Sequence, residues 1–449
     1  MDKTESYSVK YNKSDFLERM DPFFYHPTFQ NLPFKEEMLS KISDVVKVIS
    51  RKPEPGKKYK YVEISSVDSN TYKIDHPDDL EEYNYEDLPT RARKVIRKGD
   101  ILFSKMVENP LVTIVEQEHD GCVATNAFIV IKPKIDISPE LFTYLLRLGP
   151  VKKQYKRYSY GLITQITNRD FEKVKVPIPR DNILKEIEYE MKSYKKVRDE
   201  VIRQYRNLVQ DINDKFLKML DINQIENPTV NSFIVKGNKI DADKLHPSFY
   251  SPEYTIILDL IEAYSGEIVF LEDIIKEVTI GYPISPTKNG GRKYISSSNI
   301  KPLHIDLAEC KQTEDDTSLP TLNLNDLVVV SSGYSLGTVA LVKESSVGYS
   351  FNNHIYKLNV CDEIDPNYLM IYLNSSLGKK QFERYAGGIA QKNINSKDIL
   401  KLVVIIPSKD LQEKISSSIL DYYCKVNNKY LELKEDEQRL EQKVIAILS

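Results

Sequence analysis

The sequence contains no tryptophan, only four cysteines and only six histidines. No two cysteines form a Cys-x-x-Cys pair, and no two histidines form a His-x-x-x-His pair. Zinc sites and disulfide frameworks are recognised by spacings of this kind. We therefore expect reduced, structural cysteines and neither a metal nor a cofactor.

Long apolar runs are also missing. No stretch reaches the roughly 18 apolar residues that a membrane-spanning helix needs. The first residues, MDKTESYSVKYNKSDF, are polar and charged, unlike a signal peptide. These absences predict a cytoplasmic protein. The nucleotide-binding pattern G-x-x-x-x-G-K-[ST] is absent as well, which argues against an ATP-driven motor in this chain.

Neither sign of charge is in large excess. The chain has 63 basic and 66 acidic residues, a net charge of −3. Proteins that bind DNA tightly on their own are usually more basic than this. If DNA is a ligand, its surface must be local or shared with another subunit. A length of 449 residues predicts two or more domains.

An internal repeat is the clearest feature that the sequence does have. Four segments of the first half recur in the same order in the second, at a period of about 226 residues. With their counterparts they are residues 21–27 (DPFFYHP) and 246–252 (HPSFYSP), 60–67 and 293–300, 98–104 (KGDILFS) and 324–330 (LNDLVVV), and 154–158 (QYKRY) and 381–385 (QFERY). After the last pair, Gln165 and Asn168 align with Gln391 and Asn395. The repeat predicts two copies of one domain.

Each half ends in a segment with a narrow apolar seam, spaced as in a coiled coil. The seams consist of Leu184, Ile187, Met191, Tyr194, Val201, Tyr205, Leu208 and Ile212, and of Ile419, Val426, Leu433, Leu440 and Ile447. Arg198 and Lys215 interrupt the first seam. The alternative is two amphipathic helices, each packed on its own domain; we favour a coiled coil because the seams are long and narrow.

Short β-branched runs and helix-start signals such as Ser138 and Asp365, each before proline, indicate mixed α and β structure between the seams. We predict an α+β protein with two pseudo-repeated mixed α/β domains separated by two long antiparallel coiled-coil helices. Two helices of this length, about 60 Å each, suit a ligand with two separated sites, such as duplex DNA. The expected boundaries are 1–180 for the first domain, 181–220 for a helix, 221–232 for a linker, 233–408 for the second domain and 409–449 for a helix.

These repeated motifs resemble the specificity subunits of type I restriction-modification systems. Their recognition domains carry a "G-D-I-L" strand, a glycine-containing loop, a later asparagine and a "V-P-I-P" strand before a helix. Here the motifs are residues 99–102 (GDIL), Asn126 and 176–179 (VPIP), then 325–328 (NDLV), 332–337 (SGYSLG), Asn352 and 405–407 (IIP). The first copy departs from the pattern because it lacks the second glycine of the loop, which leaves open whether both domains contact DNA in the same way.

The resemblance implies a non-catalytic subunit for phage defence, with two target-recognition domains that read two short half-sites on double-stranded DNA. Two methyltransferase (modification) subunits would bind the helices, which makes the seam residues expected subunit-interface residues. A motor-nuclease (restriction) subunit is an optional further partner. The alternatives are a scaffold or dimerisation protein and a stand-alone DNA-modifying enzyme. Residues 21–24 (DPFF) resemble an amino-methyltransferase motif, but their counterpart, HPSF, loses the acid.

Two basic stretches, 147–175 and 379–401, are the candidate DNA-binding loops, because phosphates attract cations and amide side chains read bases. The candidate residues are Lys153, Lys156, Arg157, Tyr158, Tyr160, Gln165, Asn168 and Arg169, and Lys380, Arg384, Tyr385, Gln391, Lys392, Asn393 and Asn395. The alternative is that the cations solvate a helix and the asparagines cap the next one. A weaker candidate is the glycine-rich turn with Lys288 and Arg292, which also fits a plain hairpin.

Overall fold

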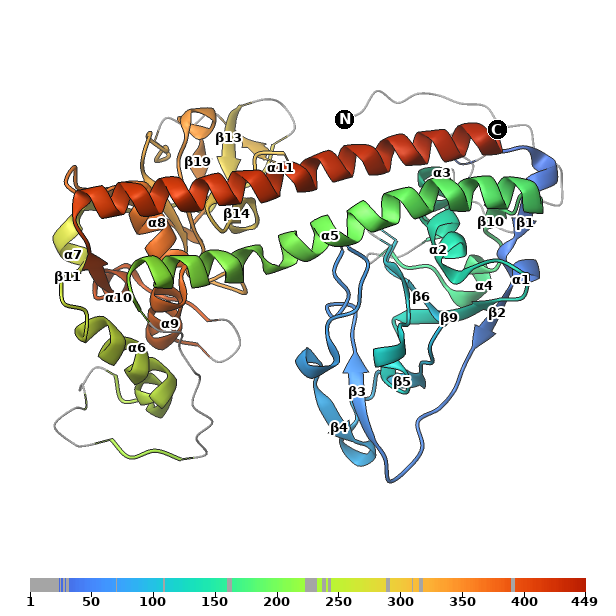
Figure 1. Ribbon diagram of the computed structural model, residues 1–449, viewed down its shortest axis with the longest axis horizontal. Coiled ribbons are helices and arrows are strands. Elements are labelled where there is room, and N and C mark those ends of the chain that lie inside the picture. Colours follow the sequence, from blue (N-terminus) through green and yellow to red (C-terminus); the bar gives the residue numbers. More distant parts are fainter. Residues whose placement is uncertain are drawn as a thin grey trace. The chain divides into compact units, whose positions relative to one another are not determined.

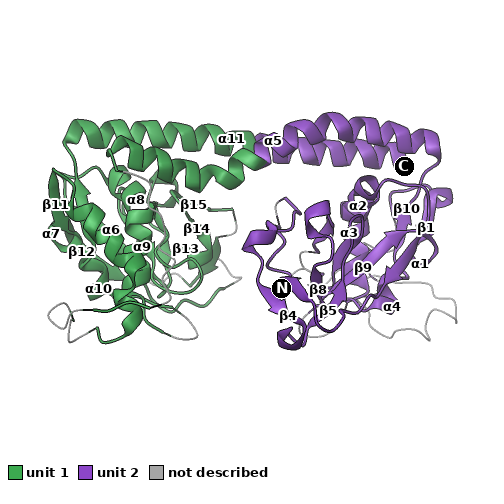
Figure 2. Cartoon of the chain, turned by 60° about the horizontal axis from the view of Figure 1, so that its bottom comes forward, with its two compact units in different colours: residues 1, 203–430 green, residues 2–202, 431–449 purple. Residues whose placement is uncertain are grey.

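The computed structural model describes residues 24, 26, 29, 32–69, 71–107, 110–159, 164–222, 232–235, 240, 244–287, 291–308, 310–314, 318–388 and 392–449. The chain forms two compact units, coloured in Figure 2. Unit 2 comprises residues 2–202 and 431–449, and unit 1 comprises residues 203–430 with residue 1. Each unit therefore combines one copy of the recognition domain with part of each of the two long helical segments that end the halves of the chain. No helix of the described chain is long and apolar enough to cross a membrane.

Unit 2 is built on two four-stranded sheets. The antiparallel sheet β2-β9-β6-β7 consists of Val46–Ile49, Phe128–Pro133, Ile101–Ser104 and Val112–Ile114. The mixed sheet β4-β3-β8-β5 consists of Glu82–Asn84, Lys58–Val62, Val123–Thr125 and Ala92–Val95, with β3 and β8 parallel. A two-stranded ribbon joins β1 (Leu39–Lys41) to β10 (Lys175–Pro177).

Unit 1 repeats this plan, which confirms the predicted duplication. Its antiparallel sheet β12-β20-β17-β18 consists of Ile275–Ile280, Ile355–Val360, Leu327–Val330 and Val339–Leu341. The mixed sheet β16-β13-β19 consists of Lys311–Thr313, Arg292–Ile295 and Ser350–Phe351, and β13 is again parallel to β19. The ribbon joins β11 (Glu267–Phe270) to β21 (Val403–Ile406), and β14 (Ile300–Lys301) pairs with β15 (His304–Ile305).

The short helices repeat in the same order. They are α1 (Ile42–Val45), α2 (Pro139–Arg147), α3 (Gly149–Arg157) and α4 (Asn168–Phe171), and then α7 (Leu271–Ile274), α8 (Pro366–Asn374), α9 (Ser376–Tyr385) and α10 (Ser396–Leu400). Unit 1 also has α6 (Pro252–Glu262). As predicted, α2 and α8 begin directly after Ser138 and Asp365, whose side chains accept hydrogen bonds from backbone N–H groups of the first turn.

Single 3-10 turns complete the secondary structure. They lie at η4 (Glu36–Met38), η5 (Pro77–Asp79), η6 (Tyr85–Asp87), η7 (Gln117–His119), η9 (Pro247–Tyr250), η10 (Ser297–Asn299) and η11 (Glu344–Ser346). Both turns that begin with His-Pro, η5 and η9, are capped by the histidine side chain.

The two predicted long helices are present as α5 (Asp181–Met219) and α11 (Lys409–Leu448). In each unit they lie side by side and antiparallel (Figure 1). In unit 2 the Tyr194 hydroxyl donates to the carbonyl of Leu433 at 3.4 Å. In unit 1 the Tyr422 hydroxyl donates to Asp211 at 2.7 Å. Rising residue numbers in α5 thus match falling numbers in α11, as an antiparallel pair requires.

Most residues of the predicted seams belong to the apolar cores of the two units, where the helix pair packs with the globular parts. Ile187, Leu208, Ile212, Ile419, Val426, Leu433 and Leu440 are buried, and Leu184, Met191, Tyr194, Val201, Tyr205 and Ile447 are half-buried. Outside the predicted seam, Ile202 and Phe216 of α5 are also buried, and the Phe216 ring packs against Tyr368 and Tyr372 of α8. The rings of Tyr205 and Tyr430 stack at 3.8 Å between centroids. Apolar packing along a narrow stripe is what stabilises such helix pairs.

The two cations that interrupt the first seam have partners outside it. Arg198 donates to the carbonyl of Thr71 at 2.7 Å, and Lys215 donates to the carbonyl of Ser418 at 2.8 Å. Neither cation is forced into the apolar stripe, because each long side chain reaches a backbone acceptor at its edge.

A buried glutamine ties α3 and α9 to the ribbons in the same way in both units. Gln154 donates to the carbonyl of Lys175 at 2.6 Å and accepts from its N–H at 2.9 Å. Gln381 makes the same two bonds with Val403, at 2.9 and 2.7 Å. Each amide thereby satisfies both backbone groups of one strand residue. These repeated bonds fix the helices whose ends carry the candidate DNA-binding residues.

Candidate nucleic-acid interface

Each unit brings two distant loops together at the end of its antiparallel sheet. In unit 2 the segment after β6 pairs with the segment after α3: Ile166 donates its N–H to Lys105 at 3.0 Å, and Met106 forms a bridge with Gln165. We call this the loop face of unit 2, comprising residues 105–107 and 164–167. The loop therefore lies beside the strand motif that carries the family resemblance.

The same arrangement occurs in unit 1. Ile394 donates its N–H to Ser331 at 3.0 Å, and Ser332 forms a bridge with Asn393. The loop face of unit 1 comprises residues 331–337 and 392–395. Gln165 and Asn393 occupy the same position in these two bridges, so they are the structurally equivalent residues. The sequence alignment of Gln165 with Gln391 was therefore wrong. Asn168 likewise does not match Asn395, because Thr167 and Asn395 are the residues that cap α4 and α10.

The turn at the start of the strand motif contains one residue with a positive φ angle in each unit. Gly99 and Asn325 have φ angles of 80° and 66°. Glycine and asparagine adopt this left-handed region most readily. The aspartates that follow, Asp100 and Asp326, are completely buried and each accept a backbone N–H bond at 2.9 Å from the residue three positions earlier. These hydrogen-bonded turns fix the start of β6 and β17, the strands that lead to the loop faces.

The missing second glycine of the first copy has a simple structural explanation. Gly337 has a φ of 72°, and a β-carbon there would lie 2.6 Å from the ring of Phe382. The backbone N–H of Val330 donates to the carbonyl of Thr338, and the backbone N–H of Ser104 makes the equivalent bond to the carbonyl of Leu111. This register places Pro110 at the position of Gly337. The two copies therefore close the same loop with different residues.

Many of the predicted DNA-binding residues are exposed. In unit 2, Lys153 and Lys156 are exposed on α3, and Gln165, Asn168 and Arg169 are exposed at or just after the loop face. In unit 1, Lys392, Asn393 and Asn395 are exposed on the loop face. Asn395 also accepts the Asp398 N–H at 2.8 Å, so the capping role considered for the asparagines applies to it. Tyr160, Lys288 and Gln391 lie outside the described residues.

Two predicted arginines make equivalent contacts inside their own units. Arg157 donates its Nε–H to the carbonyl of Phe24 at 2.9 Å, and its guanidinium carbon lies 4.3 Å from the centre of that ring. Arg384 has the same contacts with Phe249, at 3.0 and 3.9 Å. Tyr158 and Tyr385 pack edge-on against these two rings. These four residues therefore hold Phe24 to α3 and Phe249 to α9.

Replacing Arg384 with alanine is expected to destabilise the protein by about 1–2 kcal/mol, because a hydrogen bond and a cation–π contact are lost together. The exposed Lys153 is the matched control, and Lys153→Ala should change stability by less than about 0.5 kcal/mol. Urea unfolding of both variants measures the difference. If the Arg384→Ala protein is as stable as the wild type, Arg384 has no structural role and contact with DNA is its only predicted role.

The other two predicted residues of unit 1 are also engaged. Lys380 forms ion pairs with Glu253 and Glu383 at 3.1 and 3.0 Å. Arg292 lies at the start of β13, 3.5 Å from the carbonyl of Leu319. Both remain predictions as DNA contacts.

Sequence reasoning missed a basic strand in unit 2. Residues 90–98 (TRARKVIRK) contain five cations. Arg91, just before β5, and Arg93, on β5, are exposed, and Lys94 is half-buried. Lys94 reaches the carbonyl of Phe128, one residue beyond Ala127, whose carbonyl accepts the N–H of Lys105. The run of cations was the signal available in the sequence.

Unit 1 presents different chemistry at its loop face. The Ser332 hydroxyl lies 2.7 Å from Nδ1 of His354. Tyr334 is fully exposed. Ser332 corresponds to Met106, and His354 corresponds to Ala127, by the backbone bonds that pair each with its loop. The two loop faces therefore share one backbone plan and differ in their side chains.

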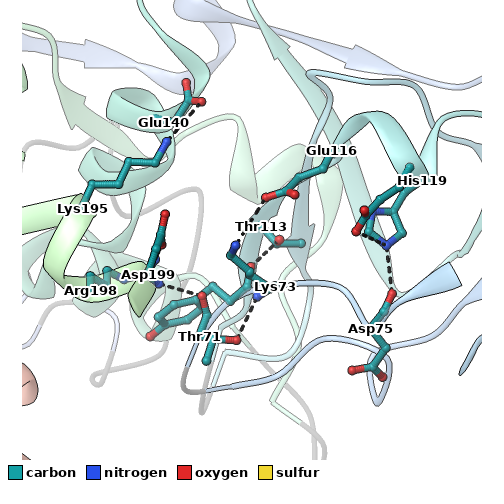
Figure 3. Close-up of polar contacts among 12 residues, drawn as sticks. Thr71, Lys73, Asp75, Thr113, Glu116, His119, Glu140, Lys195, Arg198 and Asp199 are labelled. Carbon is teal, nitrogen blue, oxygen red and sulfur yellow. Dashed lines mark hydrogen bonds and ion pairs between the residues drawn. The ribbon is translucent and has the colours of Figure 1, made fainter. Parts of the chain in front are cut away.

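A long loop of unit 2 is anchored next to α5 (Figure 3). Arg198 reaches Thr71 from the helix, and His119 Nε2 lies 2.9 Å from the carbonyl of Asp75. Between them, Tyr72 has a φ of 54° and lies 4.5 Å below the guanidinium of Arg147. Burial and the neighbouring Arg198 cation lower the pKa of Arg147. This region fastens the mixed sheet to the helical part of unit 2.

Comparison with known proteins gives the family. The sequence profile of the type I restriction modification DNA specificity domain matches residues 35–210 and again residues 266–438. The type I restriction enzyme HindI specificity subunit of Haemophilus influenzae is 23% identical over 423 residues, which cover 84% of this chain and 92% of that protein.

Solved structures of similar chains include the HsdS subunit from Thermoanaerobacter tengcongensis, with 18% identity and a TM-score of 0.33 over 91% of this chain and 95% of that one. The S subunit of a type I restriction-modification system from M. genitalium has 12% identity and a TM-score of 0.41, over 93% and 96% of the two chains.

The chain belongs to the family of type I restriction-modification DNA specificity subunits, because the family profile matches most of its length and matches it twice. It is a DNA sequence-recognition subunit with two target-recognition domains.

Proposed function

We propose that the two loop faces read the two halves of one bipartite DNA target, one half-site for each unit. The observation that carries the proposal is the duplicated loop face, in which equivalent backbone bonds hold different side chains. Hydrogen-bonding groups that point outward at the end of a rigid sheet are suited to base edges. Exposed cations such as Lys153 and Lys392 would contact phosphates and set the register on the duplex.

The chain acts without chemistry of its own in this proposal. Two separate methyltransferase subunits bind along α5 and α11 and modify adenines in the target. A motor-nuclease subunit joins the assembly for restriction of unmodified DNA in the cytoplasm. The near-neutral net charge of −3 supports a shared DNA surface, because a lone DNA-binding protein is usually more basic.

A comparison of N6-methyladenine across the host genome, with and without this gene, tests the function. We expect methylation to disappear at one bipartite motif, because the methyltransferase loses its only guide to that sequence. Exchanging residues 331–337 for those of another family member should change one half of the motif and leave the other. An expressed gene whose removal alters no motif would contradict the proposal and favour a scaffold.

A scaffold and a stand-alone enzyme are distinguished by a direct binding measurement. The purified chain with its methyltransferase should bind target DNA more tightly than the methyltransferase alone. A scaffold would assemble with its partner and add no DNA affinity. An enzyme would modify DNA without any partner.

A further inference from the structure

We propose that Lys94 and Lys105 of unit 2 form a binding site for a phosphate group of the DNA backbone. The inference rests on the proposed function, since it names a contact that fixes the first target-recognition domain on its half-site. It assigns a role to two residues that lie outside both candidate basic stretches of the sequence.

The two lysines converge on one turn, between β8 and β9. Lys94 comes from β5, where it pairs with Ala124, and its Nζ donates to the carbonyl of Phe128. Lys105 follows β6, and its N–H donates to the carbonyl of Ala127 at 2.9 Å. Strands that are separate in the sequence thus bring two cations to adjacent positions.

The charges of this pair are poorly compensated by the protein. Both side chains are half-buried, and burial lowers the pKa of both lysines. The Lys105 cation adds to this effect on Lys94, whose pKa falls to about 8. Within the described residues, neither ammonium has a carboxylate at ion-pair distance. Like charges that are partly removed from water destabilise a protein unless an anion binds between them.

A purely structural role explains the pair less well. Lysine stems often cover apolar surface, but their ammonium groups then extend into water. Here both side chains are half-buried instead, and the Lys94 ammonium donates to the backbone carbonyl of Phe128. A site kept with two desolvated cations is arranged for a ligand with concentrated negative charge.

The position of the pair points to DNA as the source of that charge. Lys105 immediately precedes Met106, which bridges to Gln165 on the loop face of unit 2. Arg91, just before β5, and Arg93, next to Lys94 on β5, are both exposed. A phosphodiester beside bases read by this face would lie within reach of both ammonium groups. Lysine binds phosphate as a point charge and needs no fixed fork geometry.

Unit 1 has no equivalent pair at these positions. Ser331 takes the place of Lys105. Its backbone N–H donates to the carbonyl of His354, just as the backbone N–H of Lys105 donates to the carbonyl of Ala127. The bridge between Thr321 and Ser350 in unit 1 is equivalent to the pair of Val95 and Val123 in unit 2. Pro320, one residue before Thr321, therefore occupies the position of Lys94. The site therefore makes the DNA contacts of the two units unequal.

The test uses the full chain with its methyltransferase partner and a duplex that carries the methylated motif. Lys94→Met and Lys105→Met are compared with Lys132→Met, an exposed lysine of the same unit on β9, about 13 Å further along that strand. The dissociation constant is measured across a range of salt concentrations. Each of the first two variants should lower the slope of log affinity against log salt by about 0.9, the loss of one phosphate contact. Lys132→Met should leave the slope unchanged.

The preference for the motif over other sequences should survive in both variants, because a phosphate contact weakens all DNA about equally. Melting curves of the free variants separate a lost contact from a damaged fold. Lys94→Arg keeps the charge and should restore the slope. Unchanged slopes in folded Lys94→Met and Lys105→Met would overturn the site and leave the proposed function standing. A wild-type complex that fails to prefer the motif would overturn the proposed function itself.

The pH dependence of binding gives a second readout. The lowered pKa of Lys94, about 8, means that this group is largely charged at pH 7 in the free protein. Above pH 8 the free protein loses the proton, and binding to phosphate must take it up again. Affinity should then fall by up to about tenfold for each pH unit. Lys105, whose pKa is also lowered by burial, is the cation that acts on Lys94. Lys94→Arg should therefore reduce the fall, and the remainder belongs to Lys105.

Inorganic phosphate distinguishes the sources of the anion. Competition by millimolar phosphate, together with unchanged DNA slopes in the variants, would identify a site for a small anion and overturn the assignment to DNA. Slopes that fall as expected, with weak competition by phosphate, would support a backbone contact that depends on the duplex.

Discussion

Replacing Asp326 with alanine is expected to destabilise unit 1 by about 3–5 kcal/mol, the usual effect of breaking a buried ion pair from one side. The carboxylate is completely buried and accepts bonds from Asn323 N–H at 2.9 Å and the Asn359 amide at 3.0 Å. Lys357 Nζ lies 3.6 Å away with its side chain only 11% exposed. Without the aspartate, this ammonium would stay buried with no anion.

Asp100→Ala in unit 2 is the matched control, because Asp100 occupies the same position in the repeat. Its partner, Arg51, has a side chain that is 35% exposed and can turn toward water. The expected loss is therefore smaller, about 1–3 kcal/mol. Urea unfolding, with hydrogen exchange to assign each transition to a unit, measures both variants. Equal losses would show that the burial of the lysine does not decide the difference.

Replacing Gly337 with valine is expected to destabilise unit 1 by about 2–5 kcal/mol and to remove recognition of one half-site. A β-branched residue is strained at a φ of 72°, and its β-carbon would meet the buried ring of Phe382 at 2.6 Å. The backbone must move to relieve the contact. The movement would displace Ser332 and its bridge to Asn393.

Gly348 provides the control for strain without a clash, since it has a φ of 81° and no atom within 4 Å of a β-carbon placed there. Gly348→Val should cost only the conformational part, about 1–2 kcal/mol. Unfolding measurements and a genome methylation profile check both variants. Recognition of the complete motif by a folded Gly337→Val protein would separate this loop from DNA reading.

The elements of the fold and their duplication were determined by the sequence. Local patterns decide them: proline after Ser138 or Asp365 starts a helix, and apolar residues at heptad spacing define α5 and α11. The order of motifs in the two halves predicted one domain plan used twice, and the sheets confirm it. These features depend on residues a few positions apart, so the sequence alone contains them.

The roles of individual side chains were decided by the tertiary structure. Arg157 and Arg384 were predicted as DNA contacts from local charge, but each bonds to a phenylalanine more than a hundred positions earlier. Pro110 could not be matched to Gly337 before the backbone bonds of the loop were known.

Lys94 and Lys105 become neighbours only because β5 begins and β6 ends near the turn between β8 and β9. Such placements depend on how strands from distant parts of the chain pair with one another. Composition and spacing record what each residue is able to do, while the folded chain decides which of its neighbours it meets.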